Sequence, residues 1–184
     1  MKKDILIIFL IVLITAFLLG GTEIQSVKEY YITHIDDITP ESKTVTLSIN
    51  CSTILDNMDD LDPALKQSNH IPKDGIILPP TEFALREGDT VYDVLCRALR
   101  QNKIQMEYQG ADKNRYNSVY IQGINYLYEF SCGPYSGWMY MVDGKFPNYG
   151  CSRYELKDGQ TIQWVYTCDL GNDVGCLWME GDEE

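Results

Sequence analysis

The chain has 184 residues, of which 27 are acidic and 15 are lysine or arginine, giving a formal net charge of −12. This excess of negative charge would repel a phosphate backbone, so we expect no nucleic-acid partner. The length is enough for one domain with a substantial apolar core.

The first segment, residues 1–21, is a candidate for membrane targeting. Lys2 and Lys3 precede an aliphatic run that ends at Gly20 and Gly21. A short basic flank before such a run is typical of an export signal or of a retained signal anchor. At about 1.5 Å per residue the run spans roughly 25 Å, which fits both alternatives. We favour a retained anchor in the cytoplasmic membrane and expect the rest of the chain at the cell surface.

The remainder divides by composition into three parts. Residues 22–43 are polar and charged, which is typical of a stalk between a membrane and a domain. Residues 44–178 are expected to form the single folded domain. Residues 179–184 are expected to be a solvated acidic tail.

The first half of this domain alternates between strand and helix signals. Residues 45–50 alternate apolar and polar side chains and predict a half-buried strand that ends at Cys51. A short strand over 82–85 and a turn over 87–89 follow. A helix is predicted from Thr90, because Asp89 or Thr90 can cap it and apolar residues recur at helical spacing on one face. These residues are Val91, Val94, Leu95, Ala98 and Leu99.

The second half predicts more strands. Residues 104–108 and 119–121 are expected to be strands, and residues 138–146 a hairpin around Asp143-Gly144, because both turn positions tolerate positive φ. Residues 161–167 alternate apolar and polar side chains like the first strand, and they predict a strand that is followed by Cys168. This order predicts an α+β, β-grasp-like mixed sheet with one main helix, in which the first and last strands lie parallel and adjacent.

Six cysteines in an exported chain favour disulfides, and their spacing lacks the Cys-x-x-Cys pairs typical of zinc sites. If the first and last strands are neighbours, Cys51 and Cys168 emerge at the same edge, and we predict that they are bridged. Cys132 and Cys151 flank the expected hairpin and form the second predicted pair. The sequence leaves the pairing of the other two cysteines, Cys96 and Cys176, open.

Tryptophan, tyrosine and glycine are concentrated between Glu129 and Cys168. One interpretation is that the rings brace a small sheet. The other is that they line a shallow apolar platform, where glycines at 133, 137 and 150 let a planar ligand or a partner chain approach the backbone. The platform would consist of Tyr135, Trp138, Tyr140, Phe146 and Tyr149.

Patterns for catalysis and metal binding are weak. The acidic stretch 56–62 lacks a glycine-centred calcium loop and a glutamate at the required offset. The chain has two histidines, His34 in the stalk and His70 in a loop, and neither is placed to activate a serine or cysteine nucleophile. No spacing singles out an acid and a nucleophile among the carboxylates. We therefore predict no catalytic residues, no metal and no enzyme activity.

Three stretches carry a resemblance to a known family. They are TVYDVLCRAL at 90–99, GWMYMVDGKF at 137–146, and LKDGQTIQW at 156–164. Together with Gly150 and Tyr154 they resemble the C-terminal β-domain of transcobalamin and intrinsic factor, which also occurs as a single copy in bacterial cell-surface proteins. The likeness covers roughly residues 44–175.

The resemblance implies a β-grasp fold and a ligand of the cobalamin class. In the vertebrate carriers this domain closes over cobalamin from one side, and a large α-helical domain holds it from the other. This chain has no counterpart of that helical domain, so a corrinoid would need a partner protein to complete the site. No resident cofactor is expected.

Two functions remain open from the sequence. The first is an exported, non-enzymatic module that binds a corrinoid or another planar small molecule through the hairpin. The second is a structural or adhesive surface domain that contacts other proteins.

Overall fold

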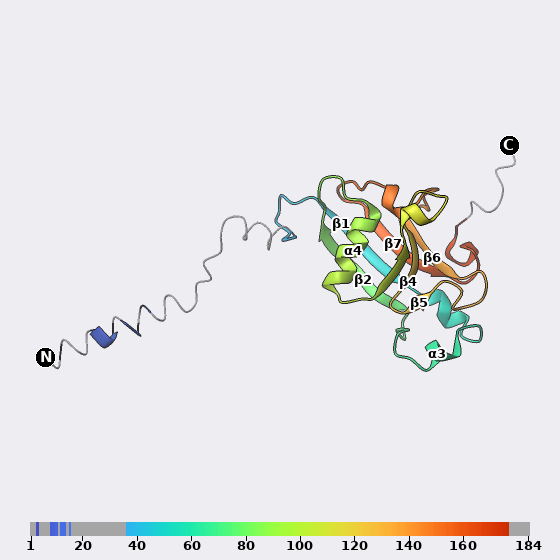
Figure 1. Ribbon diagram of the computed structural model, residues 1–184, viewed down its shortest axis with the longest axis horizontal. Coiled ribbons are helices and arrows are strands. Elements are labelled where there is room, and N and C mark those ends of the chain that lie inside the picture. Colours follow the sequence, from blue (N-terminus) through green and yellow to red (C-terminus); the bar gives the residue numbers. More distant parts are fainter. Residues whose placement is uncertain (1–2, 4–7, 11, 14, 16–35, 177–184) are drawn as a thin grey trace. The chain divides into compact units, whose positions relative to one another are not determined.

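The structure is a computed structural model that describes residues 3, 8–10, 12, 13, 15 and 36–176 (Figure 1). Most of the expected membrane segment, most of the expected stalk and the whole acidic tail lie outside these residues. The chain divides into two compact units, residues 1–37 and 38–184. The residues described between 3 and 15 are helical. Within the described ranges, no helix is both long enough and apolar enough to span a membrane.

A four-stranded mixed sheet forms the centre of the second unit, with strand order β2-β1-β7-β6. The central strands β1 and β7 run parallel, with Thr46 opposite Thr161 and Asn50 opposite Val165, and each edge strand pairs antiparallel with its neighbour. The strands are β1 (Thr44–Asn50), β2 (Ile76–Ala84), β6 (Gly137–Val142) and β7 (Thr161–Thr167). The predicted α+β, β-grasp-like fold is confirmed.

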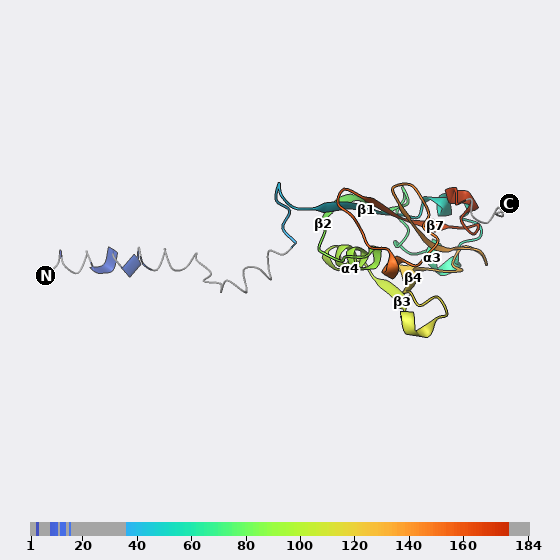
Figure 2. The same ribbon diagram turned by 90° about the horizontal axis from the view of Figure 1, so that it is seen from above.

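One long helix and a second, antiparallel sheet lie on the same side of this central sheet (Figure 2). The helix is α4 (Val91–Gln101), and the second sheet contains β3 (Met106–Gln109), β4 (Tyr120–Ile124) and β5 (Leu127–Tyr128). The short elements are η1 (Ser52–Asp56), α3 (Pro63–Lys66), η2 (Ala111–Lys113), η3 (Cys151–Arg153) and η4 (Asn172–Val174).

The start of α4 is fixed by a capping box. The Thr90 hydroxyl accepts from the backbone N–H of Asp93, and the Asp93 carboxylate accepts from the backbone N–H of Thr90. This arrangement satisfies donors that the first helical turn leaves unpaired. The apolar face predicted from the sequence is buried against the sheet, which confirms the expected helix.

Two of the predicted elements differ in the structure from the sequence expectation. β2 begins at Ile76 rather than near residue 82 and continues through Pro79 and Pro80. Proline lacks a backbone donor, and β2 tolerates this loss because it lies at the edge of the sheet. Asp143 and Gly144 both have positive φ, as the hairpin signal predicts, but the chain after this turn does not return as a strand. β7 takes the place beside β6 instead.

A buried ion pair connects α4 to the chain that precedes it. Arg97 donates to both carboxylate oxygens of Asp89, at 2.9 and 2.6 Å, and also to the Ala84 carbonyl at 2.8 Å. Burial alone would raise the pKa of Asp89, but hydrogen bonds from the Arg97 side chain and the Arg86 backbone, and the charges of both arginines, outweigh it. The pKa of Asp89 is therefore held below its usual value, and the pair stays charged in the folded protein.

Replacing Asp89 by Asn tests this pair. At neutral pH we expect the free energy of unfolding to fall by about 3 kcal/mol, because the Arg97 charge remains buried without its carboxylate. Because the pKa of Asp89 is lower in the folded state, its carboxylate stabilises the fold at pH values above the unfolded-state pKa of about 3.9. This stabilisation is lost as the pH falls through the folded-state pKa. Urea unfolding from neutral to acid pH, followed by circular dichroism, should therefore show a shallower acid dependence for Asp89→Asn than for the wild type.

The matched control is Glu87→Gln, which removes an exposed carboxylate two residues away. This variant should keep the wild-type stability at neutral pH and the wild-type acid dependence. An equal loss of stability in both variants would contradict a specific role for the ion pair.

Candidate functional site

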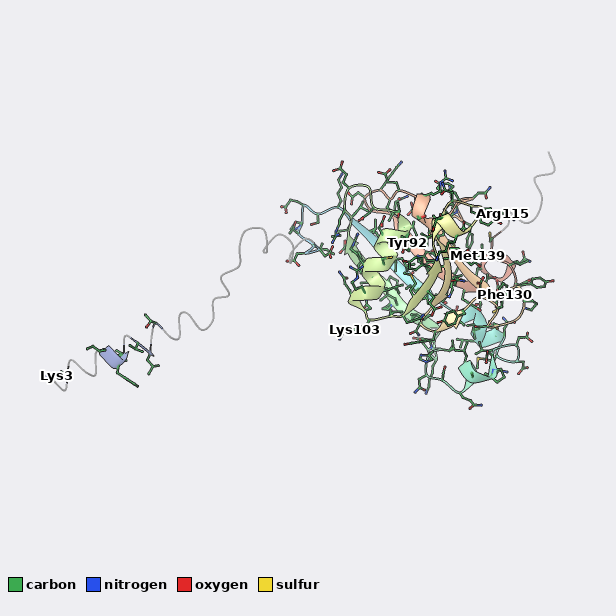
Figure 3. All side chains as sticks on the ribbon, viewed as in Figure 1. Lys3, Tyr92, Lys103, Arg115, Phe130 and Met139 are labelled. Carbon is green, nitrogen blue, oxygen red and sulfur yellow. The ribbon has the colours of Figure 1, made fainter. Side chains whose placement is uncertain are left out.

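An open groove of about 600 Å³ lies between β4, β6 and the loops that flank them. Figure 3 labels two residues of this region, Met139 on β6, which lines the groove, and Arg115 in the loop that leads to β4. The main lining residues are Tyr116, Val119, Tyr120, Trp138, Met139, Tyr140, Phe146, Pro147, Tyr149, Arg153 and Trp164.

The groove brings together four of the five aromatic residues predicted to form a platform. Trp138 and Tyr140 come from β6, and Phe146 and Tyr149 from the loop after it. The fifth, Tyr135, lies in the loop before β6, does not line the groove and is 57% exposed.

The rings that line the inner wall also brace the core. Trp138 is 8% exposed, and its indole N–H donates to the Leu127 carbonyl at 2.8 Å. Tyr140 packs against Trp164, with ring centroids 5.5 Å apart, and its hydroxyl donates to the Tyr149 carbonyl at 2.6 Å. The two interpretations of the aromatic segment are thus combined, because buried rings on β6 and β7 support the sheet and also form the floor of the groove.

The rim presents exposed aromatic faces. Tyr149 is 53% exposed and stacks on Tyr154 with a centroid distance of 5.5 Å and an interplanar angle of 13°. On the opposite side Tyr116 is 64% exposed, and the Arg115 guanidinium lies over its ring at 5.0 Å. Stacking on Tyr154 restrains the Tyr149 ring, which reduces the entropy lost when a flat ligand binds.

One side of the groove, at the start of β4, was not predicted from the sequence. Tyr116 and Tyr120 line it, but they lie far along the chain from the predicted platform. The available signal was a pair of tyrosines, with Tyr116 just before the strand predicted over 119–121 and Tyr120 within it. Only the packing of the second sheet beside β6 brings them to the same groove.

Gly150 has a different role from the one expected. A Cβ at this position would overlap the Cβ and Oγ of Ser118, so the missing side chain admits the loop before β4. Gly137 is less constrained, since a Cβ there would lie 3.8 Å from the Glu129 side chain. At residue 150 the close backbone approach therefore joins the two walls of the groove and leaves no space for a ligand.

The chemistry of the lining is neutral except for one cation. Arg153 contributes a positive charge, and no aspartate or glutamate is among the lining residues. Burial raises the pKa of Tyr140, and burial likewise raises the pKa of the Cys151 thiol to about 12. Within residues 36–176 and the few described before them, no group of three or more His, Cys, Asp or Glu side chains could hold a metal ion.

The predicted disulfides are not present, and all six cysteines are free thiols in the structure. Asn50 pairs with Val165, so Cys51 is level with Tyr166, and Cys168 lies two residues farther along the chain, just beyond the end of β7. Strand spacing then places the Cα atoms of Cys51 and Cys168 about 8 Å apart, beyond the limit of about 7 Å for a bridge.

The second predicted pair fails for a different reason. Cys151 begins η3, which packs against α4, and its thiol donates to the Val119 carbonyl at 3.5 Å. Cys132 instead lies near Cys168, close enough for each thiol to act on the pKa of the other. The expected bridge required a two-stranded hairpin over 138–146, which does not form.

Comparisons with known proteins give a family match and a likeness to solved structures. Residues 88–168 match a family described as a domain of unknown function (DUF4430). Among solved structures, the fold is similar to haptocorrin in a crystal structure described as a complex with Cbi, at 14% identity and a TM-score of 0.45. The similarity covers 72% of this chain and 27% of that protein. No curated protein matches the chain.

Replacing Gly150 by Ala tests how the groove walls are held together. The added Cβ would force Ser118 and its loop away, and we expect the free energy of unfolding to fall by about 1–3 kcal/mol. Gly137→Ala is the matched control and should change it by less than about 0.5 kcal/mol. Urea unfolding monitored by tryptophan fluorescence measures both variants, and equal stability of the two would contradict the close approach at residue 150.

Proposed function

We propose that this chain is an exported, non-enzymatic module whose aromatic groove binds a planar, largely apolar small molecule. The observation that carries the proposal is the lining of the groove. In a chain of net charge −12, the groove gathers tyrosine, tryptophan and phenylalanine rings around Arg153 without a lining carboxylate. Its volume of about 600 Å³ is in the range of small-molecule sites.

The arrangement of the rings favours a flat ligand. The Tyr149 ring is held by Tyr154 behind it, so its free face can stack on a planar group. Arg153 and the nearby Arg115 supply positive charge, which favours a ligand with carbonyl or anionic groups at its edge. Tyr140 and Cys151 remain protonated at neutral pH because burial raises both pKa values, so binding is better supported than nucleophilic or acid–base catalysis.

A corrinoid is the first ligand to test. The stretches at 90–99, 137–146 and 156–164 resemble the transcobalamin β-domain, and we extend that relationship to this chain as part of the proposal. The groove is open, so it would cover one face of a corrinoid, and a partner protein would cover the other.

Export and anchoring belong to the same proposal. Lys2, Lys3 and the aliphatic run up to Gly21 support targeting to the cytoplasmic membrane, with the domain on the outer side. A surface location would place the groove where it meets ligands from the medium.

A second candidate function is supported by a separate surface. Phe130, Tyr135 and Leu170 are all strongly exposed, and the Leu170 backbone donates to the Tyr135 carbonyl at 3.0 Å. Exposed apolar side chains grouped in this way favour contact with another protein. This surface would serve a structural or adhesive domain and does not require a small molecule.

Titration of the purified full-length chain with cobinamide and cobalamin tests the first function. We expect saturable quenching of tryptophan fluorescence, because Trp138 and Trp164 line the groove. Tyr149→Ala should weaken binding about tenfold through the loss of one stacking face. The matched control is Tyr135→Ala, which removes an equally exposed tyrosine outside the groove and should bind like the wild type.

The same titration separates the two functions. Absence of saturation with both ligands would remove the corrinoid from the proposal. Loss of binding in Tyr135→Ala but not in Tyr149→Ala would move the site out of the groove and favour the surface around Phe130 and Leu170.

A further inference from the structure

We propose that Cys132 and Cys168 form a disulfide when the protein meets a small-molecule disulfide such as oxidised glutathione. This pair differs from both pairs expected from the sequence. It is also independent of the groove, since neither cysteine lines it.

The first observation is proximity. The thiols of Cys132 and Cys168 are close enough for each to act on the pKa of the other. Both are also close enough to Tyr166 to act on the pKa of its hydroxyl. The two sulfur atoms therefore share one small space beside the end of β7.

The second observation is a backbone frame that holds the two residues together. Gly137 pairs with Thr167 at the start of β6, so Ser136 lies one position further, level with Cys168. The Ser136 hydroxyl accepts from the Cys132 backbone N–H at 3.0 Å and donates to the Gly133 carbonyl at 2.9 Å. These bonds close a turn that holds Cys132 beside Ser136. Because Ser136 is level with Cys168, the turn also brings Cys132 near Cys168.

Neighbouring segments fix both ends of this frame. The backbone of Cys132 pairs with that of Leu61 in an isolated antiparallel β-bridge, and the Cys132 thiol donates to the Asn57 carbonyl at 3.4 Å. The Cys168 backbone N–H donates to the Asp173 carboxylate at 2.7 Å. With both backbones fixed, bridge formation needs rotation of the side chains and little movement of the chain.

The reaction balances as two thiol–disulfide exchanges. Cys168 is half-buried and more accessible than Cys132, so its thiolate attacks one sulfur of oxidised glutathione and releases the first glutathione thiol. The Cys132 thiolate then attacks the Cys168 sulfur of this mixed disulfide and releases the second. The protein loses two protons and two electrons, and the reagent's S–S bond is reduced to two thiols.

The environment makes this pair slow to react at neutral pH. Burial raises the pKa of both thiols, to about 12 for Cys168, so the thiolate fraction is small. The rate of bridge formation should therefore increase with pH, about tenfold per pH unit while both thiols remain mostly protonated.

Non-reducing peptide mapping of the oxidised full-length chain tests the proposal. Trypsin cleaves after Arg115, Lys145 and Lys157, which places Cys132 in peptide 116–145 and Cys168 in peptide 158–184. We expect these two peptides to be linked after incubation with oxidised glutathione and separated after reduction. Cys51 and Cys151 lie in other tryptic peptides, so the two pairs expected from the sequence would give different linked products.

Three variants complete the design. Peptide 158–184 also contains Cys176, so Cys176→Ser should retain the linked product, whereas Cys132→Ser and Cys168→Ser should lose it. The wild-type map needs no substitution and remains informative if a variant fails to fold. A wild-type map with no link between the two peptides, or a link that disappears in Cys176→Ser, would overturn the proposal.

Discussion

The parallel pairing of β1 with β7 is the constraint on which the rest of this structure depends. The two strands are the first and last of the domain, and a parallel pair needs a long crossover connection. The chain between them supplies that crossover, and it includes α4, the second sheet and β6. β7 must therefore find its place between β1 and β6, and its buried rings Trp164 and Tyr166 take fixed positions there.

Two side-chain donors then join the second sheet to this centre. The Trp138 indole binds the Leu127 carbonyl, and the Tyr166 hydroxyl binds the Tyr128 carbonyl at 2.7 Å. Both acceptors belong to β5, a strand of two residues that could not hold its place by backbone pairing alone. The groove exists because these bonds set β4 beside β6, which brings Tyr116 and Tyr120 opposite Tyr140.

The sequence predicted those elements whose signals are local. The alternation in residues 45–50 and 161–167, and the helical spacing after Thr90, gave β1, β7 and α4, and with them the fold class. Strand β5 was missed because its turn uses Asn125 and Tyr126 at positive φ in place of the usual glycine. Four platform residues were predicted because they lie close in the sequence. The other wall of the groove and the proximity of Cys132 to Cys168 depend on tertiary packing, which no local pattern encodes.

The consecutive prolines of β2 affect how the protein behaves at high protein concentration. An edge strand offers unpaired backbone groups to which a second molecule could add its own strand. Pro79 and Pro80 have no N–H to donate to an incoming strand, and their rings crowd an incoming backbone. Molecules crowded together are thereby protected from joining edge to edge into fibres, at the side of the sheet away from the groove.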